Sequence, residues 1–211
     1  MIKNILFDLG GVIIDADLQA AIDRFRSLGL KNVSDYLNLY RQNDFFLQVE
    51  DGSLDRQGFN DPLRSKVGRD VSDEKIEQAW LAIVKGVSVE KLHWIERNRK
   101  NFRFYLLSNI NPYVFEWANS SKFSVLGQPL CCYFDKMFAS YRMRTTKPGV
   151  EIFQRVMEEA PLKPEETLFV DDGTKNVEAG KSLGFVTLQP QNGENWIPAV
   201  EKIIAECRWS S

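Results

Sequence analysis

Cysteine and histidine are scarce in this chain of 211 residues, which contains three cysteines and a single histidine, His93. Two of the cysteines, Cys131 and Cys132, are adjacent, and the set has neither the spacing of a disulfide framework nor that of a zinc site. The sequence therefore excludes a disulfide-stapled scaffold. We expect the thiols to be buried in a reducing compartment.

The chain also lacks a strong net charge and long apolar runs. Its 27 basic and 29 acidic residues give a formal charge of −2, which offers no general attraction to nucleic acid or to an anionic membrane. No apolar run is long enough to span a membrane, and the first residues lead directly into a short strand without the apolar segment of a signal peptide. We expect a cytoplasmic protein, either a monomer or a small homo-oligomer, with no nucleic-acid or membrane partner.

Short apolar runs alternate with helical patterns through most of the chain. The runs predict strands near residues 5–7, 104–107, 136–140, 167–170 and 185–188. Helices are predicted from Pro148, between Asp172 and Gly184, and near residues 195–207. Strand alternating with helix is typical of the α/β class, so we predict a doubly wound parallel sheet of the Rossmann-like type.

A long helical stretch interrupts this alternation. Asp17 is predicted to cap its first helix, Ser72 or Asp73 to begin its last helix, and Gly86 to end it, with Ile83 and Val84 on the buried face. We interpret residues 16–86 as an inserted all-helical cap, and residues 1–15 and 87–211 as the α/β core. The aromatic side chains of the insert are expected to form its own core.

Polar residues stand directly after three of the predicted strands. They are Asp8, the pair Ser108 and Asn109, and the acidic pair Asp171 and Asp172. In open α/β sheets the carboxyl ends of the strands form the ligand-binding edge, so these residues would meet if their strands are neighbours. Carboxylates crowded together repel one another, and a divalent cation with a preference for oxygen ligands, such as Mg²⁺, would relieve that repulsion.

Two further features suit the binding of a phosphoryl group. Lys147 lies just before Pro148 at a helix start, and its ammonium group is a point charge that can neutralise a phosphoryl oxygen. The turn at Gly10 and Gly11 lets the backbone approach a ligand closely. The sequence therefore favours a small phosphorylated molecule as the substrate.

These residues resemble the haloacid dehalogenase-like (HAD) hydrolase superfamily. Its four motifs occur in order, as FDLGGV at residues 7–12, LLSN at 106–109, TKP at 146–148, and FVDDG at 169–173 followed by Asn176. Each motif is weak alone, whereas the ordered set spans most of the chain and is specific. The resemblance implies a Mg²⁺-dependent phosphatase of small phosphate monoesters that forms an aspartyl-phosphate intermediate.

The resemblance also implies roles for individual residues around the metal ion. Asp8 would be the nucleophile and a ligand of Mg²⁺, and the backbone carbonyl of Gly10 would be a second ligand. Asp172 would bind the ion directly, and Asp171 would bind it or hold a metal-bound water.

The remaining implied roles concern the substrate. Ser108, Asn109 and Lys147 would bind the phosphoryl group. The helical insert resembles the C1-type cap of the family, which closes over the site and selects the substrate.

The sequence departs from the family pattern at Gly10. Many phosphatases of the family have a second Asp there, which acts as the general acid and base, and its loss typically costs about 10²–10⁴-fold in rate. Bacterial α-D-glucose-1-phosphate phosphatases, which the chain resembles most in its first motif and in the EDGS segment at residues 50–53, also have Gly at this place. Asp15 or Asp17 could replace the missing group, although roles in a turn and a helix cap are the simpler interpretation.

Two alternative functions remain open on the sequence. A 2-haloacid dehalogenase also lacks the second Asp, but it is not expected to carry the paired Asp171 and Asp172. A non-enzymatic binding or regulatory protein on a degenerate phosphatase scaffold is supported by Gly10 alone, because Asp8, Lys147 and the acidic pair are intact.

Overall fold

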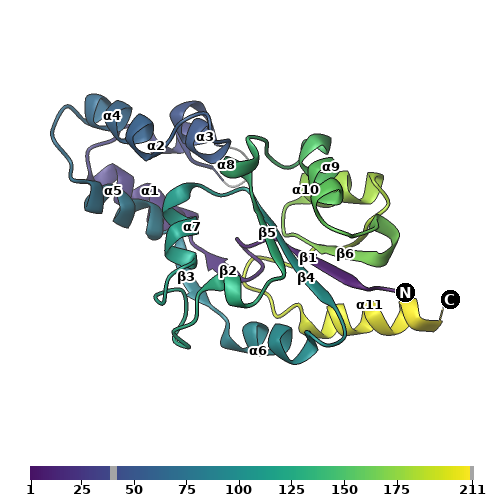
Figure 1. Ribbon diagram of the computed structural model, residues 1–211. Helices are drawn as coiled ribbons and strands as arrows, with labels where there is room; N and C mark the ends of the chain where they lie inside the picture. The colour runs from purple at the N-terminus through teal and green to yellow at the C-terminus, as the bar shows by residue number, and fades with distance from the viewer. Residues whose placement is uncertain (39–41, 210–211) are drawn as a thin grey trace.

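The computed structural model describes residues 1–38 and 42–209 and is built around a parallel five-stranded sheet (Figure 1). The strand order is β5-β4-β1-β6-β7, so β1 lies at the centre with β4 and β6 on either side. All four pairings are parallel. The strands are β1 (Asn4–Phe7), β4 (Arg103–Ser108), β5 (Lys136–Ala139), β6 (Thr167–Val170) and β7 (Val186–Leu188).

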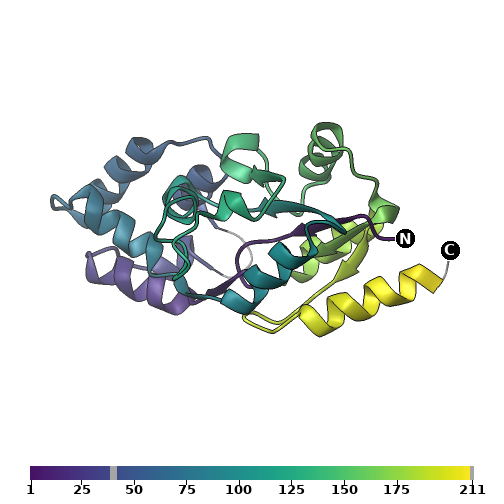
Figure 2. The same cartoon turned by 60° about the horizontal axis from the view of Figure 1, so that its bottom comes forward.

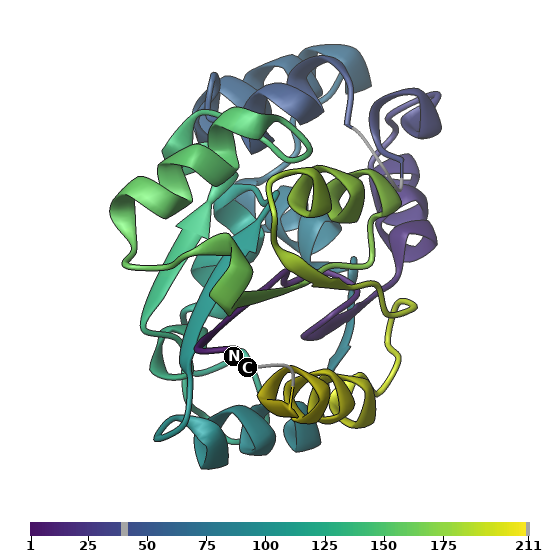
Figure 3. The ribbon, with the colours of Figure 1, turned by 90° about the vertical axis from the view of Figure 1, so that its right-hand side faces the viewer.

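Helices cover both faces of this sheet (Figure 3). Alternate side chains of β1 point to opposite faces, so Phe7 packs with Trp94 and Trp196 on one face while Leu6 packs with Phe153 on the other. The first face is covered by α6 (Val89–Asn98) and α11 (Ile197–Trp209), and the second by α9 (Val150–Glu159) and α10 (Thr174–Ser182). The predicted doubly wound α/β sheet is confirmed.

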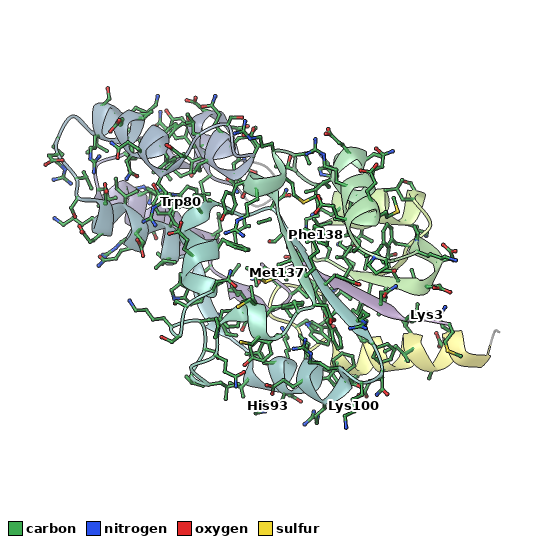
Figure 4. All side chains as sticks on the ribbon, in the orientation of Figure 1. Lys3, Trp80, His93, Lys100, Met137 and Phe138 are labelled. Atoms are coloured by element: carbon green, nitrogen blue, oxygen red, sulfur yellow. The ribbon has the colours of Figure 1, made fainter. Side chains whose placement is uncertain are left out.

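A group of five helices lies between β1 and β4 in the chain and to one side of the sheet in space (Figures 1 and 2). They are α1 (Leu18–Ser27), α2 (Val33–Tyr36), α3 (Asp44–Glu50), α4 (Arg56–Val67) and α5 (Asp73–Leu81). Their core is aromatic: the ring of Phe46 lies 5.0 Å from those of Phe25, Phe59 and Trp80, and all four rings are buried. Figure 4 labels Trp80 within this group. Such pairs contribute about 0.5–1.5 kcal/mol each beyond burial alone.

The helical insert joins the sheet through a two-stranded antiparallel ribbon that was not predicted. It consists of β2 (Ile14–Ala16) and β3 (Val84–Val87). The prediction of one helix running to Gly86 is wrong: α5 ends at Leu81, Val84 lies in β3, and Gly86 pairs with Asp15. A short apolar run fits a helix or a strand equally well, and the pairing of Val84 with Ala16 in β2 decides for the strand.

Two predicted helix caps are confirmed. The Asp17 carboxylate accepts a hydrogen bond from the backbone N–H of Ala20 at 2.9 Å, and the Ser72 hydroxyl accepts one from Lys75 at 3.4 Å. The predicted helix after Pro148 is present, but it begins two residues later, at Val150, with Gly149 as its N-cap.

Two of the cysteines that were expected to be buried lie on the surface of the protein. Cys131 and Cys132 are exposed on the short 3₁₀ turn Leu130–Cys132, where Leu130 occupies the one buried position. The expectation of buried thiols is therefore wrong for this pair. His93 is exposed on α6 (Figure 4). The remaining elements are α7 (Pro112–Ala118), α8 (Ser140–Met143) and a second 3₁₀ turn, Pro164–Glu166.

Within residues 1–38 and 42–209, no helix combines the length and the apolar character needed to cross a membrane.

Candidate active site

Three neighbouring strands deliver polar side chains to one edge of the sheet. Phe7, the last residue of β1, lies opposite Leu106 of β4 and Val170 of β6. Asp8 and Asp171 therefore follow at the same level, and Ser108 lies one residue further along β4. The predicted binding edge requires these strands to be neighbours, and β4 and β6 do lie on either side of β1. Asp8 and Ser108 line a cavity of about 220 Å³ together with Gly10, Asn109, Lys147 and Asp172.

Lys147 is the centre of the buried charge at this edge. Its side chain is fully buried, with Nζ 3.1 Å from Oδ1 of Asp8 and 2.5 Å from Oδ2 of Asp171. Nζ also donates a hydrogen bond of 2.9 Å to the carbonyl of Leu107. Burial disfavours the ammonium form, but Asp171 and Asp8 together outweigh it and hold the pKa of Lys147 above its ordinary value. The lysine is therefore a fixed positive charge beside Asp8.

Two asparagines position these groups. The side-chain amide of Asn109 pairs with the backbone of Lys147, accepting from its N–H at 2.8 Å and donating to its carbonyl at 2.9 Å. Asn176 donates to both carboxylate oxygens of Asp171, at 3.0 and 3.2 Å, and the N–H of Gly173 adds a bond of 2.8 Å. Asn109 thus orients the lysine, and its predicted contact with a phosphoryl group stays a prediction.

Asp8, Asp171 and Asp172 form a compact acidic cluster. One oxygen from each lies within 4.8 Å of the others. Burial and the charges of Asp171 and Asp172 raise the pKa of Asp8 to about 7, although Lys147 acts to lower it. Burial and Asp171 raise the pKa of Asp172 to about 6. Hard oxygen donors in such a cluster suit a divalent cation of the Mg²⁺ type.

Gly11 explains how Asp172 comes so close to the first strand. Its φ angle is +72°, which favours glycine, and a Cβ atom there would lie 2.0 Å from Oδ2 of Asp172. The carboxylate therefore occupies space that any other residue at position 11 would fill.

The raised pKa of Asp172 predicts a pH-dependent effect of Asp172→Asn on metal-free protein. Because the folded-state pKa lies above that of the unfolded chain, the folded state binds more protons, and wild-type stability falls as pH rises from about 4 to about 6. The variant lacks this loss. The free energy of unfolding of the variant minus that of the wild type should therefore be about 1–3 kcal/mol larger at pH 7 than at pH 4. Urea denaturation with a chelator present measures the difference, and a difference independent of pH would contradict it.

The geometry agrees with a comparison against protein families. The family model of the haloacid dehalogenase-like hydrolases matches residues 2–184. The chain belongs to this family. Among curated proteins, this hydrolase is similar to a D-ribitol-5-phosphate phosphatase of Bacteroides thetaiotaomicron, with 45% identity covering 93% of this chain and 95% of the relative.

Two solved structures extend the comparison. A HAD-like family hydrolase from Porphyromonas gingivalis is 39% identical with a TM-score of 0.93, covering 97% of this chain and 98% of that one. A HAD family enzyme from Bacteroides thetaiotaomicron, in complex with magnesium and inorganic phosphate, is 35% identical with a TM-score of 0.85, covering 93% and 98%. The fold and the family of this HAD-like hydrolase are thereby established.

The cavity of this HAD-like hydrolase also contains polar residues to which the sequence analysis gave no role. Asn38, Gln42 and Glu50 come from the helical insert, and Lys175 and Asn192 from the core. Nothing in the local sequence distinguishes the first two from surface residues of a helical region. Glu50 lies in the EDGS segment at residues 50–53, and its place in that segment was the signal that could have identified it.

The two carboxylates considered as substitutes for the missing Asp are engaged elsewhere. Asp17 caps α1, and Asp15 lies in β2 with Oδ1 at 3.9 Å from Nζ of the buried Lys91. Neither is among the residues that line the 220 Å³ cavity. The structure therefore favours structural roles for both residues, Asp17 as a helix cap and Asp15 in the ribbon beside Lys91.

Proposed function

We infer that this HAD-like hydrolase is a Mg²⁺-dependent phosphatase that hydrolyses the phosphate monoester of a small sugar or polyol through an aspartyl-phosphate at Asp8. The observation that carries this inference is the placement of Asp8 beside the buried Lys147, at the mouth of a polar cavity. A nucleophilic carboxylate and a fixed cation for the phosphoryl oxygens are the groups that such a transfer needs.

The donor set fits Mg²⁺. Asp8 and Asp172, with the backbone carbonyl of Gly10, would hold the ion, and Asp171 would support it, since its own oxygens already accept bonds from Lys147, Gly173 and Asn176. The bound ion would neutralise the acidic cluster and polarise the phosphoryl group. The magnesium and phosphate complex of the 35% identical enzyme supports this assignment.

The chain's own residues supply the rest of the chemistry. A carboxylate oxygen of Asp8 attacks phosphorus, and the bond between phosphorus and the ester oxygen breaks to release an alcohol. Lys147 and Ser108, with Asn109, hold the phosphoryl oxygens during the transfer. Water then attacks phosphorus, which releases inorganic phosphate and regenerates Asp8.

The substrate class follows from the relative and from the cavity. The 45% identical protein is named for D-ribitol 5-phosphate, a phosphorylated polyol. The cavity has a polar lining that includes Asn38, Gln42 and Asn192, which suits a substrate rich in hydroxyl groups. The side-chain amides of Gln42 and Asn192 are themselves held by the backbones of Asn38 and Ala16. Residues 16–86 would act as the cap that selects this substrate over a core of residues 1–15 and 87–211.

Neither alternative function is favoured by an observation on the site. Asp171 and Asp172 are both present beside Asp8, and such an acidic pair is not expected in a carbon-directed dehalogenase. A degenerate binding protein would have no need to keep Asp8 next to a buried cation.

A substrate panel tests the proposal. Purified protein is incubated with sugar phosphates, polyol phosphates, nucleotides and 2-chloropropionate, with Mg²⁺ or with EDTA. We expect phosphate release from sugar or polyol phosphates with Mg²⁺ and none with EDTA. Release that is unaffected by EDTA, or release of halide in place of phosphate, would overturn it.

A further inference from the structure

The proposed chemistry leaves one proton without a donor. A polyol phosphate is an ester of an ordinary alcohol, whose alkoxide is a poor leaving group unless it is protonated as the bond breaks. Gly10 occupies the position two residues after Asp8 and has no side chain to do this. A Cβ atom built on Gly10 meets nothing within 4 Å, so the space in front of it is open.

Glu50 comes from the helical insert and lines the same cavity as Gly10. Together with Gly10, Ser108 and Asn109 it lines both the 220 Å³ cavity and an adjoining cavity of about 90 Å³. Among the described residues that line the larger cavity, only Asp8, Asp172 and Glu50 have carboxyl groups. Asp8 and Asp172 belong to the acidic cluster, so Glu50 is the carboxyl group left over.

The Glu50 carboxyl group is uncommitted, whereas its backbone is held firmly. Within the described part of the chain, its side chain takes part in no hydrogen bond or ion pair. Its carbonyl accepts a bond of 2.7 Å from the hydroxyl of Ser140, at the start of α8 in the core. Two residues on, a Cβ atom at Gly52 would lie 2.0 Å from the carbonyl oxygen of Tyr141, so the backbones are in direct contact. The end of α3 is thus fixed against the core, with a free carboxyl group in the cavity.

The charges around Glu50 suit a group that carries a proton at neutral pH. Burial and the negative charges of Asp8 and Asp51 raise the pKa of Glu50 to about 8, with Lys147 acting in the opposite direction. A proton donor needs its pKa close to the working pH.

We propose that Glu50 is the general acid and base of this phosphatase, acting from the helical insert in place of the side chain that Gly10 lacks. The proposal rests on the function inferred above. As Asp8 attacks phosphorus, the Glu50 proton goes to the departing ester oxygen, which leaves as a neutral alcohol. The Glu50 carboxylate then takes a proton from the water that attacks the aspartyl-phosphate, and phosphate and the starting enzyme result.

The test compares two esters with leaving groups of different basicity. Glu50→Gln keeps the shape of the side chain and removes its proton transfer. With Mg²⁺ saturating, kcat/KM for D-ribitol 5-phosphate should fall about 10²–10⁴-fold, and that for p-nitrophenyl phosphate by less than about 10-fold, because nitrophenolate leaves without a proton. The variant should also lose the decline in rate that the wild type shows as pH rises and Glu50 ionises.

A rescue and a control complete the experiment. Gly10→Asp introduced into the Glu50→Gln protein should recover at least about 10-fold of the lost activity, because the space at position 10 is open. Glu158→Gln is the control. It makes the same chemical change on an exposed residue of α9 that does not line the cavity, and activity should stay within about twofold.

Three results would overturn the proposal: equal losses for the two esters, a change confined to KM, or a change confined to Mg²⁺ affinity. A wild-type protein that releases phosphate from neither ester, nor from any sugar or polyol phosphate of the substrate panel, would instead overturn the proposed function itself.

Discussion

Asp8→Asn is expected to lower phosphatase activity by at least about 10⁴-fold. An amide oxygen is a far weaker nucleophile than a carboxylate, so the aspartyl-phosphate cannot form at a useful rate. The variant should remain folded, because the amide keeps the shape of the side chain and removes one of three mutually repelling carboxyl groups. Phosphate release from the best substrate of the panel, measured with saturating Mg²⁺, gives the ratio.

Asp17→Asn is the matched control for this variant. It makes the same chemical change at a residue that caps α1 outside the cavity, and asparagine caps helices as well as aspartate does. Its activity should stay within about twofold of wild type. If Asp8→Asn kept more than about a tenth of wild-type activity, Asp8 would not be the nucleophile.

Lys147→Met is expected to damage both stability and activity. Methionine has a similar length and no charge, so Asp8 and Asp171 would be left in a buried site without their cation. Removing one partner of a buried ion pair costs about 3–5 kcal/mol, and we expect the free energy of unfolding to fall by that amount near pH 8. Activity should fall by at least about 10²-fold, because a fixed charge next to the phosphoryl group is lost.

The stability loss should depend on pH and on the partner. Lys147 lowers the pKa of Asp8, so without the lysine Asp8 takes up a proton more readily below about pH 7, and the loss should shrink there. In metal-free urea denaturation, adding Asp171→Asn to Lys147→Met should recover part of the lost stability, since one unpaired charge is removed. A double variant as unstable as the single one would contradict the account of Lys147 as the counter-ion of this pair.

The sheet and the residues at its edge could be predicted because their signals are local. Each strand is an apolar run that ends in a polar residue, and the rule that ligands bind at the carboxyl ends of strands then brings Asp8, Ser108 and Asp171 together. The adjacency of β4, β1 and β6 bears this out. The caps at Asp17 and Ser72 were also local, because a capping side chain bonds the backbone three residues ahead.

The features that could not be predicted from the sequence depend on contacts between residues far apart in the chain. Val84 reads as part of a helix until β2, some 70 residues earlier, offers it a strand partner. The Leu130–Cys132 turn buries only one side chain, and Leu130 takes that place. The pairing of the Asn109 amide with the backbone of Lys147, 38 residues away, also could not be predicted from the local sequence. Glu50 reaches the cavity only because α3 is fixed against α8.

The central claim is that Asp8 carries the phosphoryl group during turnover, and chemical trapping of the intermediate tests it most directly. Protein mixed with substrate and Mg²⁺ is quenched during steady-state turnover and treated with borohydride, which reduces an aspartyl-phosphate to homoserine. Peptide mass spectrometry should find homoserine at position 8, and none there in a sample without substrate. Homoserine at another aspartate, or an unmodified Asp8 while phosphate is being released, would contradict the account.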